Sequence, residues 1–417
     1  MAESKGPGDF QFKKMTLSNY SGSKSIDLSD LLYEISIEEK IDNVTIKGQI
    51  SIIDSQNLLD NFPIIGEETL YMSIEDFYGH IQELNWHVTG ISPIKILSKS
   101  SQQEYTLFFR SKDFVATEKT EIRRSFRTSL SETAQTVFNE YFETDKELDI
   151  EETSGEQTII IPAKTPYETM MFLARKSFSV DNASSTYKFF ESRDRFHYTT
   201  MERLIDKASN EKIEERQVFT FIDPKLVESK PEKSMRNFIS YTPISRMNLI
   251  NEMRSGAMVS KITLLDLAEK TVEETVYKHY ENVENYAATD KTARKYHTDK
   301  FANDYFGEDN ILQSYLVFND TAKPSQFYED IIPKRASNAF YMNNIVVQAE
   351  SYGSWDIKLG DMINFLAPRV EVDDKQTDHT TTSGWYLVTH ITNRILGDEW
   401  KTTYVLVKTA LKGTLDE

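Results

Sequence analysis

The sequence predicts an α+β protein that is mainly β, with two related small antiparallel β-barrel domains, an α+β domain and an inserted, partly helical domain. Three observations lead to this prediction. Short β-branched and aromatic runs recur at both ends of the chain, two helix starts with capping boxes lie between them, and the chain contains an internal repeat. With 417 residues the chain is also too long for one ordinary core.

Residues 1–112 are predicted to form the first barrel, preceded by a flexible N-terminus. Alternation over residues 31–37 and a long β-branched run over 44–54 predict two strands. Further short strands follow at regular spacing up to residue 110. Several short strands at such spacing are typical of a small barrel or sandwich.

Residues 113–215 are predicted to form the α+β domain. Ser129 followed by Glu132 is a capping box, and the apolar side chains after it share one helical face. A second capping box joins Thr165 and Glu168, with Pro166 at the first helical position, and predicts a helix that continues to Phe178. Residues 187–199 then predict a β-hairpin that turns at Arg193 and Asp194.

Residues 216–269 and 341–417 are predicted to form a second barrel that is split. β-like sequence returns at residues 217–222, and a series of short strands fills residues 344–411. Residues 270–340 between them are polar, Tyr-rich and partly helical, which predicts an inserted domain.

The split follows from an internal repeat. The matching segments keep the same order in both copies. They are 48–54 with 260–266, 64–72 with 358–365, 86–91 with 385–391, 96–97 with 395–396, and 105–109 with 404–408. Ile91 and Ile391 lie 300 residues apart, whereas Asp54 and Asp266 lie 212 apart, so the second copy must contain an insertion. Strands of Ile, Val and Thr resemble one another by composition, but the conserved order favours duplication over coincidence.

Composition and charge limit the classes of function. A net charge of −18 argues against a generally basic nucleic-acid binder, because such binding needs clustered Lys and Arg. An acidic surface would suit a wall that DNA slides past, although solubility explains it equally well. The absence of cysteine excludes disulfides and Cys-based zinc sites, and points to assembly in a reducing cytoplasm. The sequence shows no signal-peptide core, and its apolar runs are too short to span a membrane.

The sequence resembles the central hub proteins of contractile-tailed bacteriophage baseplates, an architecture shared with type VI secretion spike proteins. The passages that carry the resemblance are residues 26–37, 50–59, 62–67, 189–197, 248–267 and 384–389. The resemblance implies a homotrimer in which two related barrels per subunit form a ring of approximate sixfold symmetry. It also implies tail-tube or baseplate proteins on one side, with wedge proteins as possible neighbours, and a trimeric central spike on the other. Because residue 417 follows the last predicted strand closely, the spike is expected to be a separate protein.

This reading gives a structural virion protein, located in the phage tail baseplate and assembled in the host cytoplasm. DNA is expected only as cargo passing through the lumen, and the chain is expected not to bind membranes itself. The alternatives are a tail-associated cell-wall hydrolase and a glycan-binding module.

No residue is predicted to be catalytic, cofactor-binding or metal-binding, and the interface residues are not identified. Glu67 and Glu68 fail as a hydrolase pair, because adjacent residues on a strand point to opposite faces. His379 near Asp373 and Asp374 is best explained as part of a solvated loop, or of a loop that touches a neighbouring ring.

Two further groups of residues favour structural roles. Ser55, Ser92 and Ser383 lack the context of a nucleophile elbow and are predicted to be turn residues. Trp86 and Trp385 occupy matching places in the repeat, which favours packing over sugar binding.

Overall fold

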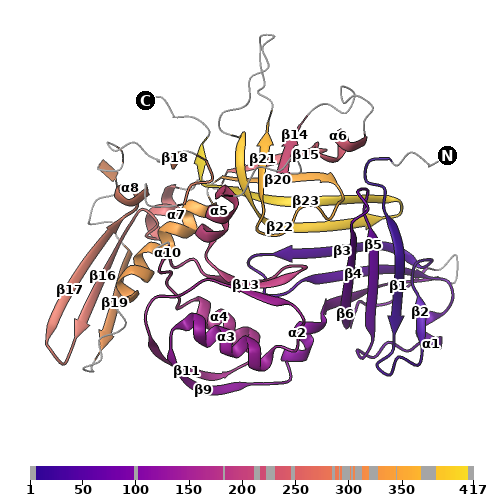
Figure 1. Ribbon diagram of the computed structural model, residues 1–417, viewed down its shortest axis with the longest axis horizontal. Coiled ribbons are helices and arrows are strands. Elements are labelled where there is room, and N and C mark those ends of the chain that lie inside the picture. Colours follow the sequence, from indigo (N-terminus) through magenta and orange to yellow (C-terminus); the bar gives the residue numbers. More distant parts are fainter. Residues whose placement is uncertain are drawn as a thin grey trace, which may run out of the picture.

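The computed structural model describes most of the chain and is mainly β (Figure 1). The described residues are 6–97, 102–181, 184–210, 217–221, 231–245, 249–283, 287–290, 292–293, 301, 304–305, 312–318, 327–343, 345–367 and 382–411. Within them, the strands form a 14-stranded sheet and several smaller sheets, which confirms the predicted fold class. No helix of the described part is long and apolar enough to cross a membrane.

The N-terminal part of the chain, called here the first module, supplies one half of the large sheet. Its elements are β1 (Gln11–Ser18), β2 (Ser25–Asp27), β3 (Leu32–Lys40), β4 (Lys47–Asp54), α1 (Leu58–Asn61), β5 (Thr69–Glu75), β6 (Ile81–Ile91), β7 (Lys95–Leu97) and β8 (Gln102–Ser111). Burial alternates along β3 and β4, so that Ile35, Ile37, Ile50 and Ile52 point into one core. Trp86 lies in the same core.

The second module supplies the other half of the sheet. Its elements are β14 (Val218–Thr220), α6 (Pro231–Met235), β15 (Ser240–Ser245), β20 (Ile345–Tyr352), β21 (Met362–Leu366), β22 (Gly384–Leu396), β23 (Glu399–Lys408) and β24 (Ala410–Leu411). Its core contains Tyr386, Ile391 and Tyr404.

Five strands follow the same order in both modules. The order is β3-β4-β8-β6-β5 in the first module and β15-β20-β23-β22-β21 in the second, with antiparallel neighbours throughout. The sixth strand differs, because β1 runs antiparallel to β5 whereas β14 runs parallel to β21. The shared order supports the predicted internal duplication.

The modules join edge to edge, and the predicted closed barrels are not found in the pairing of the described strands. Residues of β22 from His390 to Leu396 pair with β3, so the two modules share one continuous sheet. Closing the first module would require the outer edge of β3, which β22 already occupies. The edge that could close a barrel is used here to join the modules.

One predicted match of the repeat is corrected by the strand pairing. Residues 260–266 fall in β16 (Val259–Asp266), which pairs with β17 (Thr271–Lys278) and β19 (Leu312–Phe318) in a separate sheet. The counterpart of β4 in sheet order is β20. A boundary between residues 269 and 270 would therefore cut the β16–β17 hairpin. The error has a simple cause: β-branched strands look alike, and pairing partners decide where each one lies.

The remaining elements of the insertion lie between β15 and β20. They are α7 (Leu249–Arg254), α8 (His279–Asn282), β18 (Thr292–Ala293) and α10 (Phe327–Asn343). In Figure 1 the sheet of β16, β17 and β19 extends away from the first module, on the opposite side of the molecule.

Residues 112–210, called here the hairpin domain, lie below the large sheet except for their last helix, which packs against the second module (Figure 1). Its elements are α2 (Lys112–Thr117), β9 (Ile122–Thr128), α3 (Leu130–Tyr141), β10 (Glu147–Ile150), β11 (Gln157–Lys164), α4 (Pro166–Ala174), β12 (Lys188–Glu191), β13 (Arg195–Thr199) and α5 (Met201–Asn210).

Both predicted capping boxes and the predicted hairpin are present in this domain. Ser129 caps α3 and Thr165 caps α4, and β12 pairs antiparallel with β13. The second helix ends at Ala174 rather than Phe178. Beyond this end, the Ser177 hydroxyl donates to the carbonyl oxygen of Leu173.

Candidate functional site: the junction of the modules

The turn between β12 and β13 lies where the hairpin domain meets both modules. It carries Glu191 and Arg193, which are both buried although their side chains are charged. Charged side chains are rarely buried unless they are paired. Their partners identify which segments the turn holds together.

Glu191 ties the turn to the first module. Its carboxylate accepts hydrogen bonds from the Thr45 hydroxyl at 2.8 Å, the Ile46 backbone N–H at 3.3 Å and the Ser111 hydroxyl at 2.7 Å. Lys146, from the segment between α3 and β10, donates to the same carboxylate at 2.7 Å. One carboxylate therefore fixes three separate segments to the turn.

Arg193 ties the same turn to both modules. Its Nε lies 3.1 Å from a carboxylate oxygen of Glu39 on β3, and both side chains are almost fully buried. Its two terminal nitrogens donate to the carbonyl oxygens of Trp355 and Ile357, in the loop between β20 and β21 of the second module. The guanidinium also lies 5.0 Å from the centre of the Trp355 ring.

In the Glu39–Arg193 pair, burial and the nearby positive charges have opposite effects on the Glu39 carboxyl. Burial raises the pKa of the Glu39 carboxyl, while the positive charges of Arg193 and Lys146 oppose that shift. Neither Glu39 oxygen has a hydrogen-bond partner with good geometry, so the ion pair carries the compensation for burial. Such a pair adds little net stability but makes removal of one partner costly.

The loop that Arg193 holds also reaches into the first module. The Trp355 backbone N–H donates to Asp76 at 3.0 Å, and its indole N–H donates to the carbonyl oxygen of Ile74 at 3.2 Å. The Trp355 ring packs beside Trp400 with ring centres 4.7 Å apart, inside the core of the first module. The junction is therefore both a polar network and a shared core.

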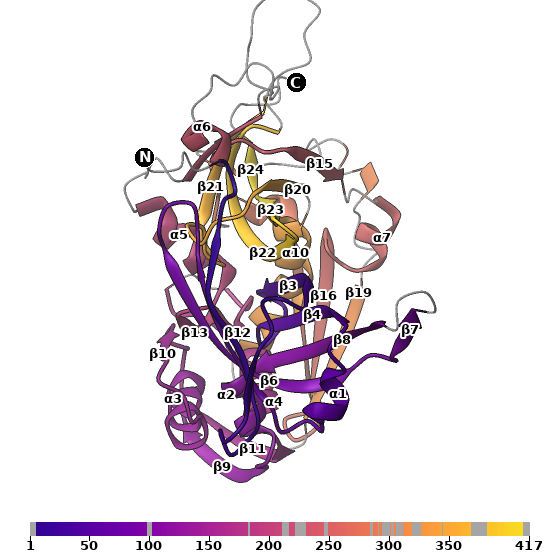
Figure 2. The same ribbon diagram turned by 90° about the vertical axis from the view of Figure 1, so that its right-hand side faces the viewer.

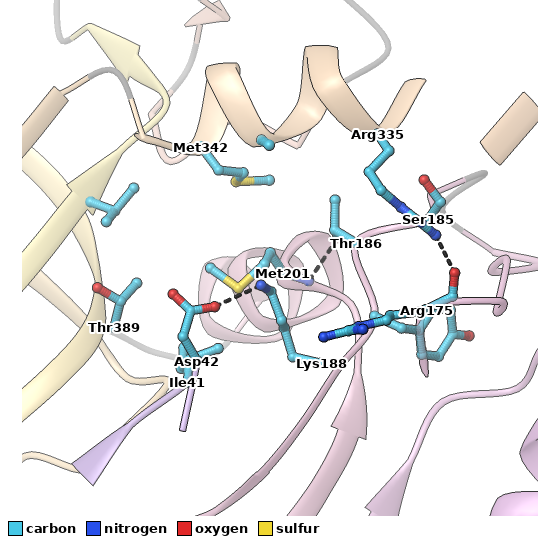
Figure 3. Close-up of a pocket in the computed structure, with 13 residues that line it drawn as sticks. Ile41, Asp42, Arg175, Ser185, Thr186, Lys188, Met201, Arg335, Met342 and Thr389 are labelled. Atoms are coloured by element: carbon cyan, nitrogen blue, oxygen red, sulfur yellow. Dashed lines mark hydrogen bonds and ion pairs between the residues drawn. The ribbon is translucent and has the colours of Figure 1, made fainter. Parts of the chain in front are cut away.

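A pocket of about 310 Å³ opens beside the junction and is lined by all four parts of the chain (Figure 3). The first module supplies Ile41 and Asp42, the hairpin domain Arg175, Ser185, Thr186, Tyr187, Lys188 and Met201, the insertion Arg335, Ala339 and Met342, and the second module Thr389 and Val407. Figure 3 shows Lys188 and Asp42 pointing toward each other, with an N–O distance of 2.6 Å.

The chemistry of this pocket does not suit hydrolysis. Among the described residues that line it, Asp42 is the sole carboxylate and it is paired with Lys188. No histidine is among the described lining residues, and the Thr186 hydroxyl donates to Glu202, whose pKa is raised by burial, so this carboxyl is a weak hydrogen-bond acceptor behind the pocket wall rather than a base inside the pocket. Arg335 donates to the carbonyl oxygen of Arg175, so α10 is fastened to the hairpin domain across the pocket. The arrangement fits a gap between packed parts better than a reaction centre.

The residues weighed from the sequence fall in separate places. Glu67 and Glu68 lie in the loop before β5 rather than on a strand as predicted, with Glu67 exposed and Glu68 buried. Glu68 accepts from the backbone N–H groups of Ile65 and Gly66, which makes it a turn-holding group. Asp373, Asp374 and His379 lie outside the described residues. Within the described part, no group of three or more His, Asp or Glu side chains is placed to hold a metal ion.

The serines and tryptophans have structural surroundings. Ser92 accepts from the Thr106 backbone N–H, and Ser383 exchanges hydrogen bonds with Ala367, while Ser55 is exposed. Trp86 is buried in the first core and Trp385 packs against the second. The packing role is confirmed for Trp86. Its counterpart by strand pairing is Tyr386, one residue after the half-buried Trp385, so the predicted match of the two tryptophans is off by one residue.

Sequence reasoning missed Glu39, Glu191 and Arg193 as the centre of the junction. The sequence predicts the hairpin and its turn at Arg193, but not the burial of these charges. Nothing in the local pattern indicates that these charges are buried, because their partners lie far away in sequence.

Comparisons with known proteins place the fold. No protein-family model matches the chain, and no curated protein sequence matches it. The crystal structure of the 43 kDa tail protein of prophage MuSo2 from Shewanella oneidensis has a TM-score of 0.56 and 11% identity, and the match covers 95% of this chain and 98% of that one. The crystal structure of the tail protein from Neisseria meningitidis MC58 has a TM-score of 0.54 and 9% identity, with coverage of 96% and 97%. The chain shares the fold of these two tail proteins, which confirms the predicted resemblance at the level of the fold.

Proposed function

We propose that this protein is a homotrimeric central hub of a phage baseplate. The observation that carries the proposal is the likeness to two tail proteins over almost the full length of all three chains. A structural role in a phage tail is the function that this fold supports best.

The repeated strand order supports a symmetry-adapter role. Two similar modules per chain give a closed trimer six similar modules, so the ring is approximately sixfold while the assembly stays threefold. Such a ring can join a hexameric tail tube or baseplate on one face to a trimeric central spike on the other. The hub is then a virion component, assembled in the host cytoplasm, through which DNA passes as cargo. The net charge of −18 would disfavour binding of that DNA to the wall.

We also propose that the hub is not an enzyme. Glu67 is exposed whereas Glu68 is buried and holds a turn, and no histidine is among the described residues that line the pocket at the junction. The buried charges at the turn between β12 and β13 instead fasten the modules together. A hub that bears load between a tube and a spike needs this kind of rigid internal connection.

The test is the symmetry of the purified protein. Sedimentation at micromolar concentration is expected to give three copies, and cryo-EM averages down the ring axis should show threefold symmetry with six similar sheet densities. A protein that stays monomeric alone and with its spike, or a ring with two unrelated densities per subunit, would overturn the proposal.

A further inference from the structure

The connection between the two modules provides a template for a contact between copies. At this connection the edge of β22 pairs with β3, and Ile395 of the second module lies opposite Ile35 of the first. Ile395 is 1% exposed and belongs to the core of the first module, not to that of its own. One module thus inserts an isoleucine into its neighbour.

The first module presents the same edge at β6 and β7. In the shared strand order, β6 and β7 together take the place of β22. Ile96 pairs with Gln103 on β8, and Ile395 pairs with Trp400 on β23, so Ile96 is the counterpart of Ile395. No described strand pairs with the outer edge of β7, which Figure 2 shows standing out from the first module. Ile96 is 73% exposed, and the nearby Ile91 and Ile94 are also exposed.

The second module presents the matching edge. In the shared strand order, β15 takes the place of β3. Thr242 pairs with Gln348 on β20, and Ser36 pairs with Gln49 on β4, so Thr242 is the counterpart of Ser36. Among the described strands β15 pairs with β20 alone, so none of them occupies its other edge. Tyr241 is the counterpart of Ile35, and it packs against Phe365 of the second core.

These two edges differ from each other, so a contact between them would be head-to-tail rather than self-complementary. A head-to-tail contact between identical chains closes into a ring when the rotation fits and otherwise gives an open filament. If the step between modules inside the chain repeats between chains, six steps return to the start in a trimer. The same geometry then serves three contacts within chains and three contacts between them.

Proline limits which partners the β15 edge accepts. Pro243 lies on β15 and has no backbone N–H, so it cannot donate to a continuous ladder. Proline on an edge strand discourages indiscriminate strand pairing. Strand pairing at this edge is therefore one donor short, and side-chain packing adds to it, for which the exposed isoleucines of the first module are suited.

We propose that the β7 edge of one copy docks against β15 of a second copy, with Ile96 inserted beside Tyr241 as Ile395 is inserted beside Ile35. This inference rests on the proposed trimeric function and assigns its interface. It commits to a second copy of this chain as the occupant, because the internal connection already displays the complementary surface.

The first experiment changes the inserted side chain. Ile96→Asp places a charge where the template buries an aliphatic side chain, and it should weaken association by about 30-fold or more, which is the range of interface hot spots. Ile160→Asp is the matched control, because Ile160 is 69% exposed on β11 of the hairpin domain. Sedimentation should give mostly monomer for Ile96→Asp at concentrations where the parent and Ile160→Asp are trimers. Circular dichroism checks that both variants fold.

The second experiment uses the absence of cysteine from the chain. Lys95 and Thr242 correspond to Arg394 and Ser36, which are opposite each other at the internal connection. Opposed residues of antiparallel strands lie within disulfide range. The double variant Lys95→Cys with Thr242→Cys should therefore oxidise to covalent dimers and trimers, but to nothing larger. Arg394→Cys with Ser36→Cys is the control and should crosslink within one chain.

The outcomes separate the interface from the function. A parent trimer that tolerates Ile96→Asp and gives no crosslink between chains overturns this interface while the hub proposal stands. Crosslinked species beyond the trimer overturn the closed ring. A parent that is monomeric, alone and with its spike, overturns the hub proposal and the interface with it.

Discussion

Thr89 and Thr389 occupy the same structural position, 300 residues apart. Each is the extra residue of a bulge, Thr89 where β6 pairs with β8 and Thr389 where β22 pairs with β23. Each also donates its hydroxyl hydrogen to a backbone carbonyl oxygen of the partner strand, at 3.2 Å to Phe108 and 3.1 Å to Val405. Bulges bend a strand at a defined place, so the two modules share a bend as well as a strand order.

The bulge threonines predict two related stability losses. Thr389→Val removes a hydroxyl that donates at a half-buried site, and the loss in unfolding free energy should be about 1 kcal/mol. Thr89 is exposed, so Thr89→Val should cost less, because water can replace the lost bond. Urea unfolding of both variants measures the difference, and Thr→Ser at each site is the control that keeps the hydroxyl. A larger loss at Thr89 would contradict the argument.

The buried pair at the junction predicts a larger effect. Arg193→Met leaves the Glu39 carboxylate buried without its partner, and the unfolding free energy should fall by about 3–5 kcal/mol. Arg195→Met is the control, since Arg195 lies on the same hairpin with a 41% exposed side chain, and should cost less than about 1 kcal/mol.

A double variant tests whether the lost charge balance is the cause. Adding Glu39→Gln to Arg193→Met removes the uncompensated charge, so part of the lost stability should return. If the loss in unfolding free energy of the double variant equals the sum of the losses of the two single variants, packing rather than charge explains the effect of Arg193→Met.

Gly48 predicts a steric effect in the first core. A Cβ added there would lie 1.6 Å from Cζ3 of Trp86, a distance that real side chains do not tolerate. Gly48→Ala should therefore cost about 3 kcal/mol or more, measured by thermal and urea unfolding. Gly90→Ala on β6 is the control, because its nearest contact would be the Phe108 ring at 3.6 Å. Combining Gly48→Ala with Trp86→Leu should cost less than the sum of the two single changes.

Elements with their own local signals could be predicted from the sequence. Ser129 and Thr165 each precede a glutamate by three residues, and this spacing alone satisfies the free N–H groups of a helix start. The match of β6 with β22 could also be predicted from comparison of the chain with itself, but the tryptophans misled its register by one residue, because Trp86 corresponds to Tyr386.

Features that depend on distant partners could not be predicted in this way. Residues 260–266 have the composition of β4, but their partners β17 and β19 place them in another sheet. Barrel closure depends on which strand takes the outer edge of β3, and that strand is β22. Glu39 and Arg193 look like ordinary surface charges until the fold brings them together.

The connection between β22 and β3 predicts a pH dependence through His390. Burial and the positive charge of Lys40 lower the pKa of His390 to about 4, against the opposing influence of Glu38. The unfolded chain has the ordinary value of about 6.5 and takes up a proton first as the pH falls. This contribution to stability is therefore complete above about pH 6.5 and is lost between pH 6.5 and pH 4, by at most about 1.4 kcal/mol per pH unit. His390→Gln removes the titrating group, so its unfolding free energy should fall less steeply from pH 7 to pH 5 than that of the parent. If the unfolding free energies of the parent and the variant differ by the same amount throughout this pH range, the pKa of His390 is not lowered in the folded protein.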